Sequence, residues 1–339
     1  SCATERRRLR KRGKVADPEE RMFIHPEVCE GCGDCGIQSN CIAIEPEETR
    51  LGRKRRINQS VCNKDYSCVK GFCPSFVTVK GGRLKSSHAE AEADDEATLL
   101  ASLPEPALPA FAEPFSMLVA GIGGNGVVTV AALLGMAAHM EEKPCTVLDI
   151  SGLAQRNGAV TSHVRFAPAE GIDLAARIPQ GSADVVLACD LVVAASPECI
   201  TRVAEGRTAI VANSFIAPTS AFATSPDLDF GGAKLEDALG RRARAFHPVD
   251  ATGIATKMLG NAIGANAFML GHAWQKGLIP LSRQSIETAI DLNGTSVALN
   301  RRAFARVCIA AGHPEKLAEW ARGDGALLPS VESLEPLVR

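Results

Sequence analysis

Cysteines dominate the first quarter of the chain. Of the 12 cysteines in 339 residues, eight fall within the first 73 positions. Cys29, Cys32 and Cys35 are separated by two residues each, and the last of the eight, Cys73, precedes Pro74. Three closely spaced thiolates wrap one compact metal centre, and a distant Cys-Pro supplies a fourth ligand from the other side. The pattern predicts an iron–sulfur site.

Zinc sites and disulfide frameworks also use closely spaced cysteines. Structural zinc sites usually combine two Cys-x2-Cys knuckles or mix Cys with His, whereas here three thiols occupy one run. No signal peptide opens the sequence, so nothing supports the oxidising compartment that disulfides require. An iron–sulfur site is therefore preferred over both alternatives.

The ligand count leaves the number of clusters open. In two-cluster ferredoxins the final Cys-Pro ligates the cluster of the other motif, so Cys73 completes the first three thiols. A second set is one thiolate short, and its members are Cys41, Cys62 and Cys68. Asp65, between the last two, is a candidate oxygen ligand. The alternative is that this half has lost its cluster and that its cysteines are buried thiols.

A glycine-rich stretch is the second chemical signal. An apolar run over residues 115–120 leads into Gly121-Ile122-Gly123-Gly124-Asn125-Gly126 and then into an Ala-rich helical segment. Strand, glycine turn and helix at this spacing are typical of a dinucleotide site, where backbone amides and the helix N-terminus meet a phosphate. A second apolar strand, residues 145–148, ends at Asp149, about where an acid binds a ribose.

The polar segment after Asp149 departs from an ordinary dinucleotide domain. Its loop lies at the carboxyl end of the second strand, where open α/β sheets bind ligands, and Arg156 is a candidate phosphate ligand. For His163, an ordinary hydrogen-bonded strand residue is preferred over an acid or base. The candidate cofactor-binding residues are Gly121, Gly123, Gly124, Asn125, Gly126, Gln155 and Arg156.

The elements around these residues divide the chain into five segments. They are a basic linker from an upstream domain (1–20), a ferredoxin-like iron–sulfur domain (21–85), an acidic, proline-rich tether (86–114), an α/β domain (115–315) and the start of a further helical segment (316–339). In the cysteine segment, strands 42–45 and 54–57 form a hairpin, and strand 76–79 pairs with residues 83–84. So short a domain with few large apolar residues needs its metal to be stable.

The larger segment predicts a Rossmann-like, doubly wound parallel sheet. Buried strands are expected at 184–188, 208–212 and 242–246, with a helix starting at Ser196-Pro197. A long helix is expected over 252–276, with four glycines on one face. This face is expected to pack against another helix, either within the chain or across a subunit interface. These glycines are Gly253, Gly260, Gly264 and Gly271. Helices are also expected from Ser282 and from Gly294.

Composition argues against several function classes. Aromatic residues make up 4% of the chain, with one Tyr, so little material exists for stacking on nucleic-acid bases. No run of about 18 apolar residues predicts a membrane span, and we expect a cytoplasmic protein. Four further cysteines in apolar surroundings are interpreted as small buried residues. They are Cys145, Cys189, Cys199 and Cys308.

Two stretches resemble the 2-oxoacid:ferredoxin oxidoreductases. Residues 121–129, Leu133-Leu134 and residues 152–165 resemble the gamma domain of that family, with Asn125 where the family usually has Gln. The cysteine stretch resembles the ferredoxin-like part of the long, fused bacterial indolepyruvate ferredoxin oxidoreductases. The resemblance covers residues 20–313, and the order of the two domains matches.

The resemblance implies a reaction and its cofactors. An aryl 2-oxoacid such as indolepyruvate would be decarboxylated on thiamine diphosphate and magnesium in an upstream domain, with the acyl group passing to coenzyme A. Electrons would leave through [4Fe-4S] clusters to ferredoxin. The gamma domain would enclose coenzyme A or brace a homodimer. No catalytic residue is expected in this segment, and neither nucleic acid nor membrane is an expected partner.

Parts of the sequence are also compatible with two other functions. The first is an iron–sulfur protein that exchanges electrons with NAD(P) or FAD, with Asp149 on the ribose. The second is a zinc-stapled module in which the basic residues 6–14 and 53–56 grip nucleic acid.

Overall fold

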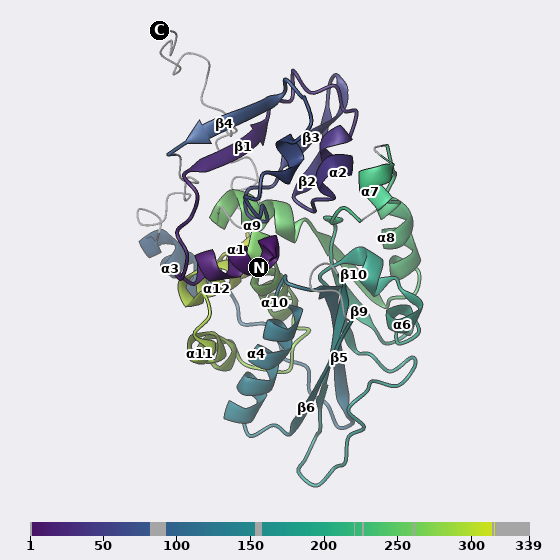
Figure 1. Cartoon of the computed structure of the whole chain (residues 1–339). Coiled ribbons are helices and arrows are strands. Elements are labelled where there is room, and N and C mark those ends of the chain that lie inside the picture. Colours follow the sequence, from purple (N-terminus) through teal and green to yellow (C-terminus); the bar gives the residue numbers. More distant parts are fainter. Residues whose placement is uncertain are drawn as a thin grey trace.

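The computed structural model describes residues 2–81, 93–152, 158–219, 221–225, 227–259, 262–313 and 315. Within them the chain forms a cysteine domain, residues 20–80, and a larger α/β domain, residues 115–312. Figure 1 shows the cysteine domain beyond one end of the large sheet. None of the described helices is long and apolar enough to cross a membrane.

The cysteine domain is built from two antiparallel pairs of strands. Its elements are β1 (Glu20–Ile24), α2 (Asp34–Ser39), β2 (Ile44–Thr49), β3 (Gly52–Ile57), η1 (Ser67–Val69) and β4 (Phe76–Lys80). The predicted hairpin is confirmed as β2 and β3. The predicted partner of strand 76–79 is wrong, because β4 pairs with β1. Residues 83 and 84 lie outside the described part of the chain.

The basic segment before β1 is a helix, α1 (Ala3–Lys11), that docks on the cysteine domain. The guanidinium of Arg7 donates to the Ser60 carbonyl, and that of Arg10 donates to the Asn63 carbonyl. These two arginines are therefore engaged within the chain. The expected origin of this segment in an upstream domain stays a prediction.

The acidic segment between the two domains contains a docked helix, α3 (Ala93–Ser102). Leu100 and Leu103 pack against the core of the α/β domain, and the Gln275 amide donates to the Pro104 carbonyl at 3.1 Å. An extended tether is thus wrong for this part of the segment, because apolar side chains follow the acidic run and bury against the larger domain. Residues 86–92 lie outside the described part.

The α/β domain is organised by a six-stranded sheet in the order β10-β9-β8-β5-β7-β6. The strands are β5 (Phe115–Ile122), β6 (Cys145–Ser151), β7 (Ala159–Phe166), β8 (Val185–Ala188), β9 (Ala209–Asn213) and β10 (Ala245–Val249). β5, β8, β9 and β10 are parallel, as expected for a Rossmann-like fold. β7 is antiparallel to both of its neighbours, β5 and β6, and its position between them was not predicted.

Most helices of this domain cover the two faces of its sheet, and the helices and short 3-10 turns are given next in chain order. They are α4 (Val127–Met140), α5 (Leu191–Ala194), α6 (Pro197–Ile200), α7 (Ala221–Thr224), α8 (Gly232–Gly240), α9 (Ala251–Leu259), η2 (Ala262–Gly264), α10 (Ala265–Gln275), α11 (Arg283–Asn293) and α12 (Val297–Gly312). Met117 and Val119 of β5 pack with α4 and α9 to α12, whereas Leu118 and Ala120 face α5, α6 and α8. This alternation makes a three-layer domain.

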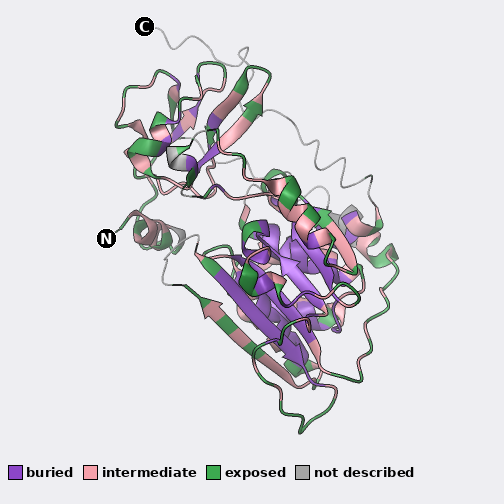
Figure 2. Ribbon diagram, turned by 90° about the vertical axis from the view of Figure 1, so that its right-hand side faces the viewer, coloured by how far each residue is buried: buried purple, intermediate pink, exposed green. Residues whose placement is uncertain are grey.

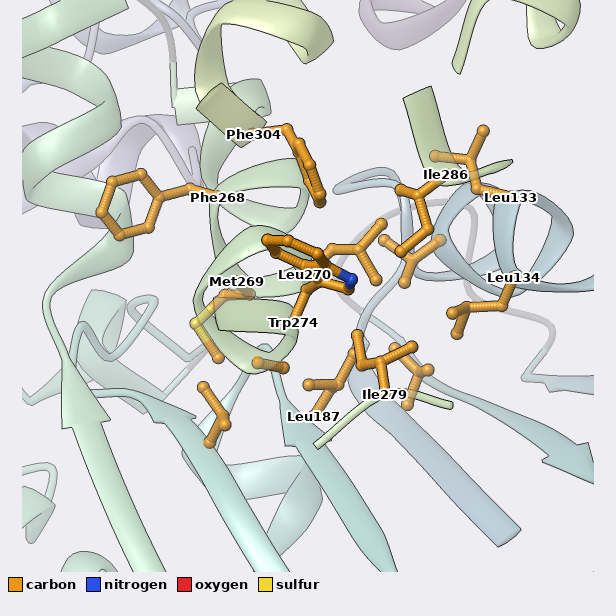
Figure 3. Packing of buried hydrophobic residues seen from close by; sticks show 14 of the residues in the cluster. Leu133, Leu134, Leu187, Phe268, Met269, Leu270, Trp274, Ile279, Ile286 and Phe304 are labelled. Atoms are coloured by element: carbon orange, nitrogen blue, oxygen red, sulfur yellow. The ribbon is translucent and has the colours of Figure 1, made fainter. Parts of the chain in front are cut away.

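The predicted long glycine-bearing helix is two helices, α9 and α10, joined through η2. The prediction that the glycine face packs against another helix is confirmed at Gly271. A Cβ atom there would lie 2.8 Å from the Phe304 carbonyl oxygen of α12. The close contact is therefore within the chain. Figure 3 shows the same seam, with Trp274 of α10 beside Phe304, ring centroids 6.0 Å apart. Gly260 lies outside the described residues.

Three of the four scattered cysteines are buried, as predicted, and the fourth is not fully so. Cys189, Cys199 and Cys308 are buried and Cys145 is half-buried, and none forms a disulfide. Burial raises the pKa of Cys189 to about 12, so its thiol stays protonated and inert.

Candidate functional site

The first cysteine loop, residues 29–35, is shaped by two glycines. Gly31 and Gly33 are left-handed, with φ of 78° and 82°, and α2 begins directly after Gly33. The Gly31 amide donates to Cys29 Sγ at 3.4 Å. A Cβ atom at Gly31 would collide with the Arg53 carbonyl, so only glycine fits there. The loop thus turns its backbone amides toward its own sulfur atoms.

The second cysteine loop, residues 62–68, repeats this backbone without glycine. Lys64 and Tyr66 occupy the corresponding positions with φ of 50° and 57°, and η1 begins directly after Tyr66. The Lys64 amide donates to Cys62 Sγ at 3.3 Å. Left-handed backbone is costly for residues with a Cβ atom. The second loop therefore has the shape of the first, at a cost in conformational free energy at Lys64 and Tyr66.

Each loop receives a cysteine from the other half of the domain. The His25 amide, just before the first loop, donates to the Ser75 carbonyl at 2.8 Å, two residues after Cys73. The Asn58 amide, just before the second loop, donates to the Ala43 carbonyl at 2.8 Å, two residues after Cys41. These bonds hold the backbone that follows Cys73 beside the start of the first loop and the backbone that follows Cys41 beside the start of the second. The ligand sets expected from the sequence stay a prediction.

Electrostatics link the thiols within each set. Burial, with a smaller contribution from the nearby Cys41 and Cys62, raises the pKa of Cys68 to about 12. Burial also raises the pKa of Cys35 to about 11, with Cys29 adding to the shift. Without a cation, these thiols hold their protons at neutral pH. Metal binding would displace the protons and bring the thiolates together.

The first set offers four thiols, the donors that an iron–sulfur cluster binds. Among the described residues, no three His, Cys, Asp or Glu side chains lie close enough to hold one metal ion. A tetrahedral zinc site needs sulfur atoms about 2.3 Å from one point. A [4Fe-4S] cluster binds its thiolates at separate iron atoms and so accepts a wider set. Amide donors to sulfur, as in both loops, are also what tunes such clusters.

The glycine turn joins β5 to α4, and its glycines have different roles. A Cβ atom at Gly121 would lie 2.7 Å from Val127 Cγ2, so this glycine permits helix–strand packing. The Gly123 amide donates to the Gly158 carbonyl at 2.8 Å and is engaged within the chain. Gly126, with φ of 95°, is the residue before α4. Gly124 and Asn125 are exposed at the tip.

Two buried asparagines at this edge of the sheet were missed by sequence reasoning. Asn266 of α10 donates to the Asn125 carbonyl at 2.9 Å and so braces the glycine turn. Asn213, at the end of β9, donates to the Cys189 carbonyl and to Thr252 Oγ1. A polar residue that ends an apolar strand was the available signal for Asn213. The predicted Gln155 and Arg156 lie outside the described residues.

Asp149 is not placed as an acid on a ribose would be. β7 separates its strand, β6, from β5 and the glycine turn. Its carboxylate accepts a hydrogen bond from Ser162 of β7. In a dinucleotide domain the acid follows the strand next to the glycine turn. This sheet order argues against the NAD(P)- or FAD-linked alternative.

His163 is confirmed as a hydrogen-bonded strand residue. It is buried in β7, and its Nδ1 accepts the Ile178 amide at 3.2 Å. Burial, with a smaller contribution from Arg202, lowers the pKa of His163 to about 4. The imidazole is therefore neutral and is engaged in packing.

The basic residues of β3 connect the two domains. Arg55 is 2% exposed, and its guanidinium lies 4.6 Å from the ring centroid of Phe222, which belongs to α7. Arg53 Nη1 donates to the Leu228 carbonyl at 2.9 Å, and Arg56 forms an ion pair with Glu45. These contacts within the chain argue against residues 53–56 as a surface for nucleic acid.

Comparison with known proteins places the α/β domain in a family context. The family model described as pyruvate ferredoxin/flavodoxin oxidoreductase matches residues 116–308, a range that does not include the cysteine loops. The chain is 31% identical to "Indolepyruvate oxidoreductase subunit IorB" of Thermococcus kodakarensis over 196 residues, 56% of this chain and 92% of that protein. It is 29% identical to the subunit of the same name from Methanothermobacter thermautotrophicus over 195 residues, 56% of this chain and 94% of that one.

Solved structures are similar over the same share of the chain. The pyruvate oxidoreductase subunit PORC of Thermotoga maritima is 21% identical with a TM-score of 0.41, covering 58% of this chain and 96% of that one. The 2-oxoglutarate:ferredoxin oxidoreductase of Magnetococcus marinus is 15% identical with a TM-score of 0.45, covering 59% of this chain and 31% of that one.

Proposed function

The chain belongs to the pyruvate ferredoxin/flavodoxin oxidoreductase family, and on that premise we propose that it is the electron-transfer and gamma-domain portion of an indolepyruvate-type 2-oxoacid:ferredoxin oxidoreductase. The complete enzyme would use thiamine diphosphate with magnesium and coenzyme A to form acyl-CoA and CO2 from the 2-oxoacid. Its electrons would go to ferredoxin. The substrate class comes from the names of the relatives, which are indolepyruvate oxidoreductase subunits.

The cysteine domain would hold [4Fe-4S] clusters, which when bound supply one-electron carriers. Cys29, Cys32, Cys35 and Cys73 would hold the first, and Cys41, Cys62 and Cys68 would contribute to the second. The amides of Gly31 and Lys64 donate to sulfur, and such donors stabilise thiolate charge. The buried Arg55 is a cation close enough to lower the pKa of Cys35 against the larger effect of burial.

The α/β domain would bind or enclose coenzyme A at its glycine turn, together with Gln155 and Arg156. Gly124 and Asn125 are exposed there, directly before the N-terminus of α4, whose amides and dipole favour a phosphate. A homodimer and a cytoplasmic location, where thiols stay reduced, complete the proposal.

One observation carries the proposal most directly: two loops of the same backbone shape, each with thiols and an amide donor to sulfur, stand beside a family-matched α/β domain. The test is anaerobic purification of the protein with any partner chains it has. We expect a brown preparation whose broad absorbance near 400 nm is bleached by dithionite and restored by oxidised ferredoxin. Indolepyruvate and coenzyme A together should reduce ferredoxin in the complete enzyme, whereas NAD(P) should not accept the electrons.

Colourless protein that contains zinc would contradict the proposed electron transfer. Iron-containing protein that reduces NAD(P) in place of ferredoxin would contradict the acceptor. A preference for pyruvate or 2-oxoglutarate over indolepyruvate would contradict the substrate class and leave the electron-transfer role intact.

A further inference from the structure

We propose that the carboxylate of Asp65 is the fourth ligand of the second cluster and completes the set of Cys41, Cys62 and Cys68. The inference rests on the proposed iron–sulfur function, and it deepens that function by naming the missing ligand.

The two loops place Cys32 and Asp65 at the same point. Cys62-x2-Asp65-x2-Cys68 has the spacing of Cys29-x2-Cys32-x2-Cys35. The amides of Cys29 and Cys62 each donate to a carbonyl four residues back, those of His25 and Asn58, at 3.0 Å in both cases. The backbone thus enters both loops in the same way.

The exit from each loop also matches. In both, the residue after Cys32 or Asp65 is left-handed, and a helical turn starts at the next residue. That turn carries the third ligand position, Cys35 or Cys68, as its second residue. Cys32 and Asp65 are both exposed, whereas Cys35 and Cys68 are both half-buried. Asp65 therefore occupies the place of the solvent-facing ligand of the first site.

A cavity lies where the second set would bind a cluster. Cys41, Cys62, Asp65 and Cys68 all line it, and the remainder of its lining includes apolar side chains such as Met22 and Ile57. Cys41 and the loop of residues 62–68 therefore meet at one space. A half that had lost its cluster would gain nothing from the left-handed backbone at Lys64 and Tyr66.

Asp65 also has a structural role within its turn, and the experiment must distinguish that role from metal ligation. Ser67 Oγ donates to Asp65 Oδ1 at 3.2 Å, an ordinary contact within a turn. A carboxylate is a harder ligand than a thiolate and binds iron less tightly. An iron atom held by Asp65 should therefore differ spectroscopically from the thiolate-bound iron atoms.

The test uses the full chain, enriched in 57Fe and purified anaerobically as wild type, Asp65→Cys, Asp65→Ala and Ser67→Ala. With two clusters, wild type should contain about eight irons and eight sulfides per chain. Mössbauer spectra should show about one iron in eight as a distinct oxygen-ligated site. Asp65→Cys should keep about eight irons and lose that site. Asp65→Ala should fall to about seven irons with the sulfide unchanged, and Ser67→Ala should match wild type.

Several outcomes would overturn the inference. About four irons in wild type would mean that the second set holds no cluster, while the first cluster and the proposed function would stand. Asp65→Ala with an unchanged iron count and spectrum would mean that Asp65 is not a ligand. A decrease in Ser67→Ala equal to that in Asp65→Ala would mean that the turn contact matters and ligation does not. Iron-free wild type would overturn the proposed function as well.

Discussion

The two domains of this chain are stabilised in different ways. In the α/β domain, alternate residues of each central strand bury against helices on both faces of the sheet, as the purple core of Figure 2 shows. In the cysteine domain the buried cluster holds only Met22, Ile24, Cys29, Ala43 and Ile57. Half-buried cysteines form much of what packs around it. The α/β domain is stabilised by apolar burial, whereas the cysteine domain buries too little apolar surface to be stabilised in the same way.

The difference teaches where each domain is sensitive. A small core contributes little stability beyond the entropy lost on folding, so ligand binding has to supply the rest. The cysteine domain also carries left-handed backbone at Lys64 and Tyr66, which costs further stability. We therefore expect the cysteine domain to depend on its clusters and the α/β domain to depend on close packing.

The largest effect should come from removing iron. After anaerobic treatment with a chelator, backbone amides of residues 20–80 should lose protection from hydrogen exchange. The central strands of the α/β domain, β5, β8 and β9, should keep it, because their core contains no ligand. Metal-dependent domains are commonly unfolded without their metal. Hydrogen-exchange mass spectrometry on holo and apo protein measures both regions in one experiment.

Reconstitution with iron and sulfide is the control, and it should restore protection in residues 20–80. If β1 to β4 stay protected in iron-free protein, the small core is sufficient and the contrast between the domains fails. If β5, β8 and β9 lose protection as well, the two domains fold as one unit.

A second prediction concerns packing in the α/β domain. Gly271→Ala should lower the free energy of unfolding of this domain by about 1–3 kcal/mol, the usual cost of overpacking. The added Cβ atom would meet the Phe304 carbonyl and the Val307 side chain of α12, and backbone cannot easily yield. Thermal denaturation measures the effect, and the iron content should not change.

Gly206→Ala is the matched control, because an added Cβ atom there meets nothing within 4 Å. It should change stability by less than about 0.5 kcal/mol. Equal stability of the Gly271 and Gly206 variants would show that the α10–α12 seam tolerates an added methyl group.

The same contrast explains what could be predicted from the sequence. The cysteine spacing and the strand–glycine turn–helix pattern are local, so the loop around Cys29 and the β5–α4 unit were predicted. The pairing of β1 with β4 joins residues 20–24 to residues 76–80, and short-range patterns carry no information on that register. The place of β7 was not predicted for a related reason. Its insertion between β5 and β6 depends on pairing between distant segments, and it buries the polar Thr161, Ser162 and His163 inside the sheet.

The continuous helix expected over 252–276 shows a further limit. The helical periodicity was correct for both α9 and α10. The close approach of another helix at Gly271 was also correctly inferred. α9 ends at Leu259, and η2 at Ala262–Gly264 precedes α10, which packs against α12. Such a turn depends on what the helix packs against, and tertiary packing overrides local propensity. The roles of Asn213 and Asn266 depend on the same assembly.

A third, smaller effect should follow from Glu141, which ties α4 to α11. It accepts hydrogen bonds from the Ser282 amide at 2.7 Å and from Lys143 at 2.8 Å. Although burial raises its pKa, the bonds from Lys143, Ser285 and Ser282 lower it to about 2. A lowered pKa stabilises the fold above the unfolded value of about 4.3, and that stabilisation is lost as the pH falls toward 2. Glu141→Gln should therefore cost about 1–2 kcal/mol at pH 7.

The pH dependence separates this charge effect from a general loss of stability. The difference between wild type and Glu141→Gln should shrink as the pH falls from about 5 toward 2 in denaturant titrations. Glu142→Gln, at the exposed neighbouring position, should match wild type throughout. A difference that stays constant with pH would mean that the amide fails to replace the carboxylate for steric reasons.

The smallest effect should come from the contact that joins the two domains. Phe222→Leu keeps an apolar side chain but removes the ring that lies 4.6 Å from the Arg55 guanidinium. Cation–π contacts of buried arginine are worth about 0.5–2 kcal/mol, so we expect a loss of about 1 kcal/mol, confined to the coupling between domains. In calorimetry of the iron-loaded protein, the transitions of the two domains should separate further than in wild type.

Phe230→Leu is the control, since it removes the ring 5.5 Å from Phe222 and leaves the Arg55 contact in place. If Phe230→Leu separates the transitions as much as Phe222→Leu, aromatic packing around α7 couples the domains and the arginine does not.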